Sequence, residues 1–350
     1  VKLDQNENPF ELPDDFKRAV VARALSRDWA RYPEFDPTEL CAALARHWGW
    51  RADGVLAGNG SNELIEALLV VTVGEATPVV IPEPTTQLFG DPFFPRVLRG
   101  ISDRLSDAGL QLVLLMPQSR IDAERVARYL EAGHTDGVML ISLHGTDPLP
   151  ERLRRQGVPL VVGGRPPAEG SPYVDVDNRG GAARAVDHLV QIGRRRIATI
   201  AGPLDMAAGS DRLAGYRMRI AAAGLPADDA LVEFGDFSRD GGRAAMERLL
   251  ARTTLDAVFV ASDLMAVGAV AALRSAGRRI PDDVAVVAFD DSQLAVTTDP
   301  NLSSVQQPIE EMGREMARLL LDEIRAPGGP ARQVVLGTKL VVRGSTQGNE

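Results

Sequence analysis

From about residue 77 onward, short apolar runs alternate with longer stretches whose apolar residues recur at helical spacing. The apolar runs are "PVVIPEP", "LQLVLLMP", "GVMLISL", "PLVVGG", "RIATIAG", "AVFVAS" and "VAVVAFD". Short buried strands that alternate with amphipathic helices predict parallel sheets with helices on both faces. The length of the alternation predicts an α/β protein with two doubly wound lobes, and ligands bind at the carboxyl ends of such strands.

Residues 1–76 follow a different pattern, which predicts a mostly helical segment. "DDFKRAVVARALSR" places its apolar residues along one helical face, and a second helix is predicted over Thr38 to Trp48. Asp36 or Thr38 is suited to cap that helix, with Pro37 in its first turn. "GVLAGNGSNELIEALLVVTVG" then predicts a short strand, a glycine turn and a helix.

Composition narrows the function classes. The 350 residues carry a formal charge of −9, which argues against a broad nucleic-acid surface. No apolar run approaches the roughly 18 residues of a membrane helix. The N-terminus has no apolar signal-peptide core, and the single Cys41 fits a reducing compartment, so we expect a cytoplasmic protein. The four histidines show no paired metal-ligand spacing, and we expect no metal.

From Val79 to about Thr346 the chain resembles the effector-binding core of LacI/GalR-type bacterial transcription regulators. The resemblance rests on long stretches in the right order: "DGVMLIS", "VPLVVGGR", "VDVDNRGGAARAVDHLVQIGRRRIATIAG", "DRLAGYRMRIAAAG", "ASDLMAVGAVAALRSAGRRIPDDVAVVAFDD" and "LSSVQQPIEEMG". It implies the two-lobed fold of periplasmic sugar-binding proteins and a homodimer. It also implies a cleft that binds a sugar or related polar metabolite, without a cofactor.

The resemblance, carried over position by position, also implies the ligand contacts. They are Asp91, Phe93, His144, Arg165, Arg212, Phe237, Ser262, Asp263, Asp290 and Gln307. Arginine forks and carboxylates can hold neighbouring sugar hydroxyls in pairs, and an aromatic face suits the C–H face of a sugar ring. The plainer alternative is that the charged residues lie on the surface and that the phenylalanines belong to the core. If Arg212 serves the ligand alone, its removal should weaken binding and leave the ligand-free protein about as stable.

Residues 3–76 instead resemble the beginning of histidinol-phosphate aminotransferase, a pyridoxal-phosphate enzyme, through "LDQNENPF", "RYPEFDPTELCAALARHWGW" and "GVLAGNGSNELIEALL". The resemblance implies vestigial cofactor-phosphate contacts at Tyr32, Gly60, Ser61 and Asn62. An ordinary strand-to-helix turn explains "GNGSNE" equally well. The only lysines are Lys2, Lys17 and Lys339, none in a setting like that of the family's Schiff-base lysine, so we expect no transaminase activity.

The expected organisation is an aminotransferase-like fragment over residues 1–76 and an effector-binding core over 77–350. Lobe 1 is predicted over about 77–176 plus 308–330, and lobe 2 over about 177–307 plus 331–346. Nothing in residues 1–76 looks like a helix-turn-helix, so we expect no DNA binding by this chain as it stands. The two resemblances together indicate a chimera. The alternatives to a sugar-sensing module are a non-catalytic aminotransferase remnant and a transport-type binding protein.

Overall fold

The computed structural model describes residues 14–25, 38–48, 51, 76–82, 90–133, 135–145 and 147–347. The chain divides into two units, Val1–Val73 and Gly74–Glu350. In the first unit, helices α1 (Asp14–Leu25) and α2 (Thr38–Trp48) form where the sequence predicts them. The predicted strand, turn and helix that follow lie outside the described residues. So do the four vestigial cofactor positions, Tyr32, Gly60, Ser61 and Asn62.

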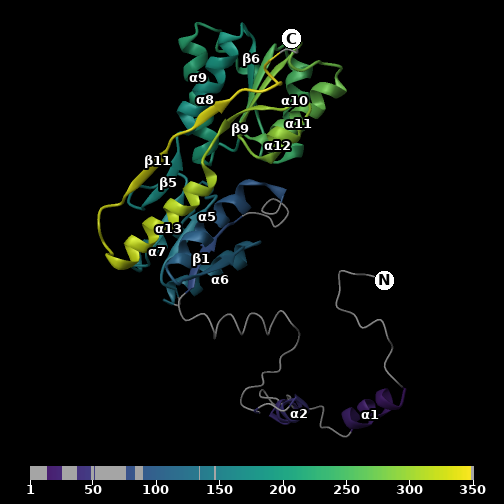
Figure 1. Cartoon of the computed structure of the whole chain (residues 1–350), viewed down its shortest axis with the longest axis vertical. Coiled ribbons are helices and arrows are strands. Elements are labelled where there is room, and N and C mark those ends of the chain that lie inside the picture. The colour runs from purple at the N-terminus through teal and green to yellow at the C-terminus, as the bar shows by residue number, and fades with distance from the viewer. Residues whose placement is uncertain are drawn as a thin grey trace. The chain divides into compact units, whose positions relative to one another are not determined.

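The second unit contains two six-stranded sheets, one in each lobe (Figure 1). The strand orders are β11-β5-β4-β3-β1-β2 in the first sheet and β12-β10-β9-β8-β6-β7 in the second. All neighbouring strands run parallel except β10 and β12, which pair antiparallel. This confirms the predicted α/β fold with two doubly wound lobes.

The elements of the first lobe are β1 (Ala76–Val80), α5 (Phe93–Asp107), β2 (Gln111–Leu115), α6 (Arg120–Glu131), β3 (Val138–Ile141), α7 (Leu149–Arg155), β4 (Leu160–Gly163), β5 (Tyr173–Val176), α13 (Ile309–Arg325) and β11 (Gln333–Leu336). Those of the second lobe are α8 (Asn178–Gln191), β6 (Ile197–Ala201), α9 (Ala207–Ala222), η2 (Asp229–Leu231), β7 (Val232–Phe234), α10 (Arg239–Arg252), β8 (Ala257–Val260), α11 (Asp263–Ser275), β9 (Ala285–Asp290), α12 (Gln293–Thr297), β10 (Ser303–Gln306) and β12 (Lys339–Val341). No helix among the described residues is both long enough and apolar enough to cross a membrane.

The chain passes between the lobes after β5, after β10 and after β11. The last passage corrects the predicted lobe boundary, which assigned all of 331–346 to lobe 2. Strand β11 instead pairs in parallel with β5 in the first sheet, and only β12 joins the second sheet. The pairing leaves no local pattern in the sequence, because β5 lies about 160 residues before β11.

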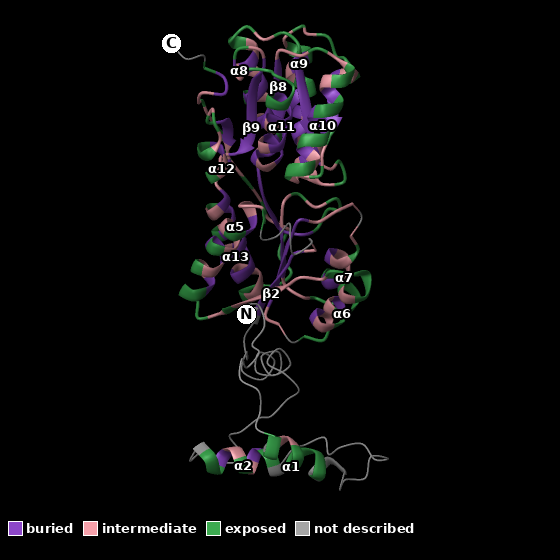
Figure 2. Cartoon of the chain, turned by 90° about the vertical axis from the view of Figure 1, so that its right-hand side faces the viewer, coloured by how far each residue is buried: buried purple, intermediate pink, exposed green. Residues whose placement is uncertain are grey.

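The central strands β1, β3, β4, β6, β8 and β9 are buried on both faces, which explains why they are largely apolar. In β1, Val79 packs into the cluster beneath α5 and α13, while Val80 faces the opposite cluster. In β8, Val258 and Phe259 face opposite sides in the same way. Figure 2 shows β8 and β9 as buried strands flanked by helices with exposed outer faces. The carboxyl ends of the strands are therefore held by rigid layers.

Helices α5 and α13 pack closely because each presents a glycine to the backbone of the other. A Cβ atom at Gly100 would overlap the carbonyl oxygen of Glu310, and one at Gly313 would overlap that of Val97. Helix α5 begins at Phe93, and α13 begins two residues after Gln307. This packing therefore fixes two of the predicted ligand contacts relative to each other.

We predict that Gly313→Ala lowers the free energy of unfolding by about 1–3 kcal/mol, because the added methyl group forces the two helices apart. Urea denaturation measures the effect. Gly329→Ala is the matched control, since nothing lies within 4 Å of a Cβ there and its backbone is not left-handed. It should change stability by less than about 0.5 kcal/mol. Equal effects of the two substitutions would show that the glycine contact is unimportant.

Candidate functional site

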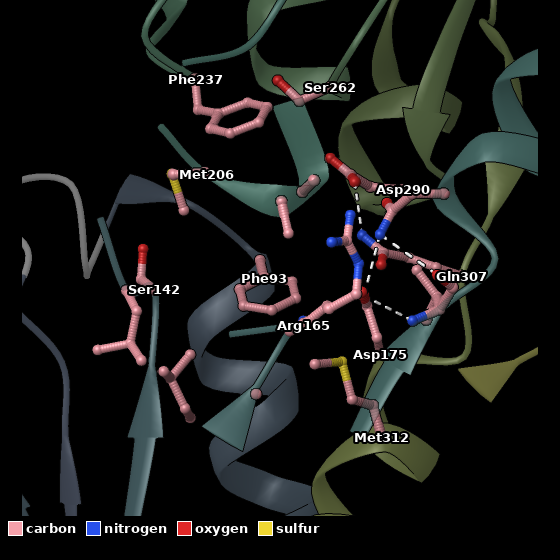
Figure 3. A pocket seen from close by; sticks show the side chains of 18 of the residues that line it. Phe93, Ser142, Arg165, Asp175, Met206, Phe237, Ser262, Asp290, Gln307 and Met312 are labelled. Atoms are coloured by element: carbon pink, nitrogen blue, oxygen red, sulfur yellow. Dashed lines mark hydrogen bonds between the residues drawn. The ribbon is translucent and has the colours of Figure 1, made fainter. Parts of the chain in front are cut away.

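A cavity lies between the two lobes, at the carboxyl ends of their strands (Figure 3). From the first lobe it receives side chains that follow β3, β4 and β5, together with the first turn of α5. From the second lobe it receives side chains at or after the ends of β6, β7, β8, β9 and β10. This is where parallel α/β sheets place their ligands.

Most of the predicted contacts line this cavity. They are Asp91, Phe93, Arg165, Arg212, Phe237, Ser262, Asp290 and Gln307. The other two predicted contacts do not line it. His144 lies at the junction of the lobes, where its Nδ1 is 3.0 Å from Oδ2 of Asp205. Asp263 is buried behind the cavity wall, where it accepts hydrogen bonds from the Ser304 hydroxyl and the Ser292 amide.

Arg212, on α9, is the buried centre of the site. Its Nε donates a hydrogen bond to Oδ1 of Asn178 at 2.8 Å, and its Nη1 donates to the Ala261 carbonyl at 2.6 Å. Nη1 also lies 3.5 Å from Oδ1 of Asp290. The guanidinium stacks 3.7 Å from the centre of the Phe289 ring. Contacts on three sides hold the guanidinium plane in one orientation.

The same network reaches two of the passages between the lobes. Asn178, just after the first passage, donates from Nδ2 to Oδ1 of Asp175 at 2.9 Å. Gln307, on the second passage, donates from Nε2 to Oδ1 of Asp290 at 2.6 Å. A chain of polar contacts therefore runs from β5 through Arg212 to the start of α13.

Two donors remain for a ligand. Nη2 of Arg212 makes no hydrogen bond with any residue that the structure describes, although the side chain is only 6% exposed. Ser262 accepts a hydrogen bond from the Met265 amide as the N-cap of α11, and its own hydroxyl hydrogen has no acceptor within the described part of the chain. A buried donor without a partner costs free energy, so both groups favour a ligand with acceptors.

Burial dominates the electrostatics of the cluster. It raises the pKa of Asp290 well above its usual range, and the nearby Arg212 offsets this only in part. It raises the pKa of Asp175 as well, against two backbone hydrogen bonds that lower it. The pKa of Asp263 is raised to about 6 by burial, although neighbouring serines donate to it. Burial lowers the pKa of Arg212, while the surrounding carboxylates act in the opposite direction.

The remaining walls are apolar. Phe93 and Phe94 contribute aromatic rings that meet edge to face at 5.4 Å, and Phe237 contributes a ring from the other lobe. Met206 and Met312 complete these walls. Aromatic walls with a few fixed polar groups are typical of sites for small molecules.

Backbone strain is concentrated at this site. Among the described residues other than glycine, left-handed backbone occurs at Ser142 (φ 62°), Phe237 (φ 65°), Asp290 (φ 116°) and Asp291 (φ 53°). Ser142, Phe237 and Asp290 line the cavity, and Asp291 directly follows Asp290 in the sequence. Such conformations are costly and cluster at functional sites. This independent observation supports the cavity as a binding site.

Several lining residues are not among the predicted contacts, including Ser142, Asp175, Asn178, Met206 and Met312. The strand that carries Asp175, β5 (Tyr173–Val176), was not among the predicted apolar runs, although "YVDV" is a short, largely apolar run that ends near a turn. The methionines carry no comparable signal, since apolar residues near helix starts usually belong to the core. Among the described residues no group of histidines, cysteines and carboxylates is placed to hold a metal.

Comparison with known proteins gives consistent results. A family model described as a periplasmic binding protein-like domain matches residues 186–346. The HTH-type transcriptional regulator CelR of Thermobifida fusca is 49% identical over 281 residues, covering 79% of this chain and 83% of that protein. The ribose operon repressor of Escherichia coli (strain K12) is 34% identical over 261 residues, covering 73% and 78%.

Two solved structures extend the comparison to three dimensions. A complex of the regulator CelR with cellobiose matches with a TM-score of 0.75 at 44% identity, covering 90% of this chain and 100% of that one. A LacI family regulator from Enterococcus faecium with bound ribose matches with a TM-score of 0.68 at 27% identity, covering 79% and 100%.

The buried network changes what the removal of Arg212 should do. Arg212→Ala removes the hydrogen-bond partner of the buried Asn178 and the cation beside the buried Asp290, so we predict that the ligand-free protein loses about 3–5 kcal/mol of stability. Sequence analysis expected almost no loss. Arg219→Ala, on the same helix, removes a more exposed ion pair with Asp187 and should cost at most about 1 kcal/mol. Chemical denaturation of both variants decides, and similar losses would rule out the structural role.

Proposed function

Because the chain belongs to the LacI family of transcriptional regulators, we propose that its cleft binds a sugar whose presence the regulator senses. Its relatives are sugar-responsive regulators rather than enzymes, and the chain covers their effector-binding region. One observation in the site supports the proposal most directly. The buried Arg212 lines a cavity with aromatic walls, and no described residue accepts a hydrogen bond from its Nη2.

A sugar fits these groups chemically. Hydroxyl oxygens accept from Arg212 Nη2 and from the Ser262 hydroxyl, and hydroxyl hydrogens can be donated to the carboxylates of Asp290 and Asp91. The C–H faces of a pyranose ring are apolar and pack against Phe93 from one lobe and Phe237 from the other. The ligand would then contact both lobes at once.

The proposed ligand is a β-1,4-linked glucose disaccharide of the cellobiose type. Support comes from the 49% identity to CelR and from the match to the CelR–cellobiose complex. Two linked pyranose rings offer hydroxyls to the polar cluster around Arg212 and apolar faces to the aromatic walls, so both halves of the cavity are used.

Contacts between the lobes support a route by which binding is transmitted. His144 meets Asp205, and the Gly145 amide donates to the Asp205 carbonyl at 2.9 Å. Arg165 Nη2 lies 2.6 Å from Oδ2 of Asp211. A ligand that contacts both lobes stabilises the arrangement in which these pairs form. It thereby increases the fraction of molecules in which the lobes make these contacts.

Other expectations remain predictions. They are the homodimer, the lack of DNA binding by this chain, and the aminotransferase resemblance of residues 3–76, most of which lie outside the described part of the chain. The pyridoxal-phosphate alternative gains no support from the cleft.

We predict that the full chain binds cellobiose, and that Arg212→Lys weakens binding at least about tenfold because the Nη2 donors are lost. Isothermal titration calorimetry measures both. Arg219→Lys makes the same substitution on the same helix, outside the cleft, and should leave affinity within about threefold. Circular dichroism and the heat-capacity change of thermal unfolding check that both lysine variants are folded.

Three outcomes would contradict the proposal in whole or in part. If Arg212→Lys binds cellobiose as tightly as the unaltered chain, the guanidinium does not contact the ligand. If cellobiose does not bind and maltose does, the cleft binds a sugar of a different linkage. If neither disaccharide binds, the proposed function is wrong.

A further inference from the structure

The charges around the cavity are unequal. Among the described residues, three carboxylates line it, those of Asp91, Asp175 and Asp290, against two guanidiniums, those of Arg165 and Arg212. This part of the lining has no surplus of positive charge.

Both guanidiniums are already neutralised. Nη2 of Arg165 lies 2.6 Å from a carboxylate oxygen of Asp211, a fourth acid at the edge of the site. Arg212 lies 3.5 Å from Asp290, and the charges of Asp175, Asp263 and Asp91 act on it too. Neither group offers an uncompensated charge to a ligand.

From this imbalance we propose that the cleft selects uncharged saccharides and rejects their anionic counterparts, such as uronates, aldonates and sugar phosphates. The inference rests on the proposed function and names the ligand class of the same site. An anionic sugar would give up its hydration on entering the cavity and would meet carboxylates without a free cation.

Such selection matters for a sugar sensor. A disaccharide and its acidic derivative share both rings and most hydroxyls, so shape and hydrogen bonding separate them poorly. Charge separates them strongly, because juxtaposed like charges are among the most effective means of excluding a wrong partner. Hydroxyl groups, in contrast, can use Arg212 Nη2 without disturbing the balance of charge.

The test compares methyl β-cellobioside with its analogue in which the non-reducing CH₂OH group is oxidised to a carboxylate. Calorimetric titration of the full chain at pH 7.5 should show the uronate binding roughly ten- to a hundredfold more weakly. Asp211→Asn releases Arg165 and should narrow this ratio by several-fold. Asp187→Asn is the matched control, because it removes the same charge from an ion pair with Arg219 outside the cleft and should leave the ratio unchanged.

Each result is decisive. A uronate that binds within threefold of the neutral glycoside would overturn the charge selection and leave the proposed function intact. Equal changes of the ratio in Asp211→Asn and Asp187→Asn would show that net charge, and not the cleft, discriminates. Failure of both glycosides to bind the unaltered chain would remove the proposed function, and with it this inference.

A second, independent observation concerns the position of the Phe237 ring. Gly202 directly follows β6, and a Cβ atom there would overlap three carbon atoms of that ring. The backbone of Gly202 is not left-handed, so its conformation would tolerate any residue, and only the ring excludes a side chain. Phe237 itself is held at φ 65°, where Oδ1 of Asp236 accepts from the Ser238 amide at 2.9 Å.

We infer that Gly202 is a positioning residue that sets the height of the Phe237 ring over the cavity. Gly202→Ala pushes the ring toward the ligand and narrows the space between Phe237 and Phe93. If Gly202 acts through the ring, Gly202→Ala lowers ligand affinity only when the Phe237 ring is present. A purely structural defect at Gly202 would lower affinity with or without the ring.

A double-mutant cycle tests this. We expect Gly202→Ala to weaken binding of methyl β-cellobioside about tenfold, and to change it less than about threefold in a Phe237→Leu background, where the overlap is relieved. Equal losses in the two backgrounds would refute the positioning role. Should Gly202→Ala alone fail to fold, the double variant must match Phe237→Leu in both affinity and unfolding midpoint, and a deficit in either would equally refute it.

Discussion

A single buried guanidinium sets the requirements for the region between the lobes. Arg212 is 5% exposed, and a charge so far from water is tolerated only where partners match it on every side. The carbonyl that ends the β8 segment, the amide of Asn178, the carboxylate of Asp290 and the ring of Phe289 supply those partners. Phe289 and Asp290 come from β9, Ala261 directly follows β8 and Asn178 begins α8, so these elements must end or begin close together for the charge to be buried at all.

This requirement links the binding site to the passages between the lobes. Asn178 and Gln307 each lie where the chain crosses, and each is tied to the guanidinium, Asn178 directly and Gln307 through Asp290. A ligand that takes the remaining N–H groups of Arg212 completes a network that already extends into both crossings. Binding and lobe arrangement therefore depend on the same few hydrogen bonds, and no separate route of communication is needed.

The two doubly wound lobes could be predicted from the sequence, because fully buried parallel strands consist of consecutive apolar residues. The family resemblance supplied ten contacts, of which eight line the cavity. Arg165, Ser262 and Asp290 among them also lie at or just after strand ends, where parallel sheets place ligands. The sequence could not decide which side chains near a strand end turn inward. Asp263, one residue beyond Ser262, is turned into the wall by Ser304 and Ser292, whereas the unpredicted Asp175 is exposed to the cavity. Strand β11 was misassigned for a related reason, because pairing with a distant strand leaves no local pattern.

A neutral ligand gives the charged cluster a physical rationale. Ionised groups form stronger and more directional hydrogen bonds than neutral ones, and such bonds are what distinguishes one hydroxyl arrangement from another. Uncompensated charge would attract ions of the opposite sign and bind them without regard to shape. A guanidinium surrounded by carboxylates keeps the strong donors and acceptors and cancels most of the field. The strain at Ser142, Phe237 and Asp290 is then the cost of aiming these groups and the aromatic wall at one small volume.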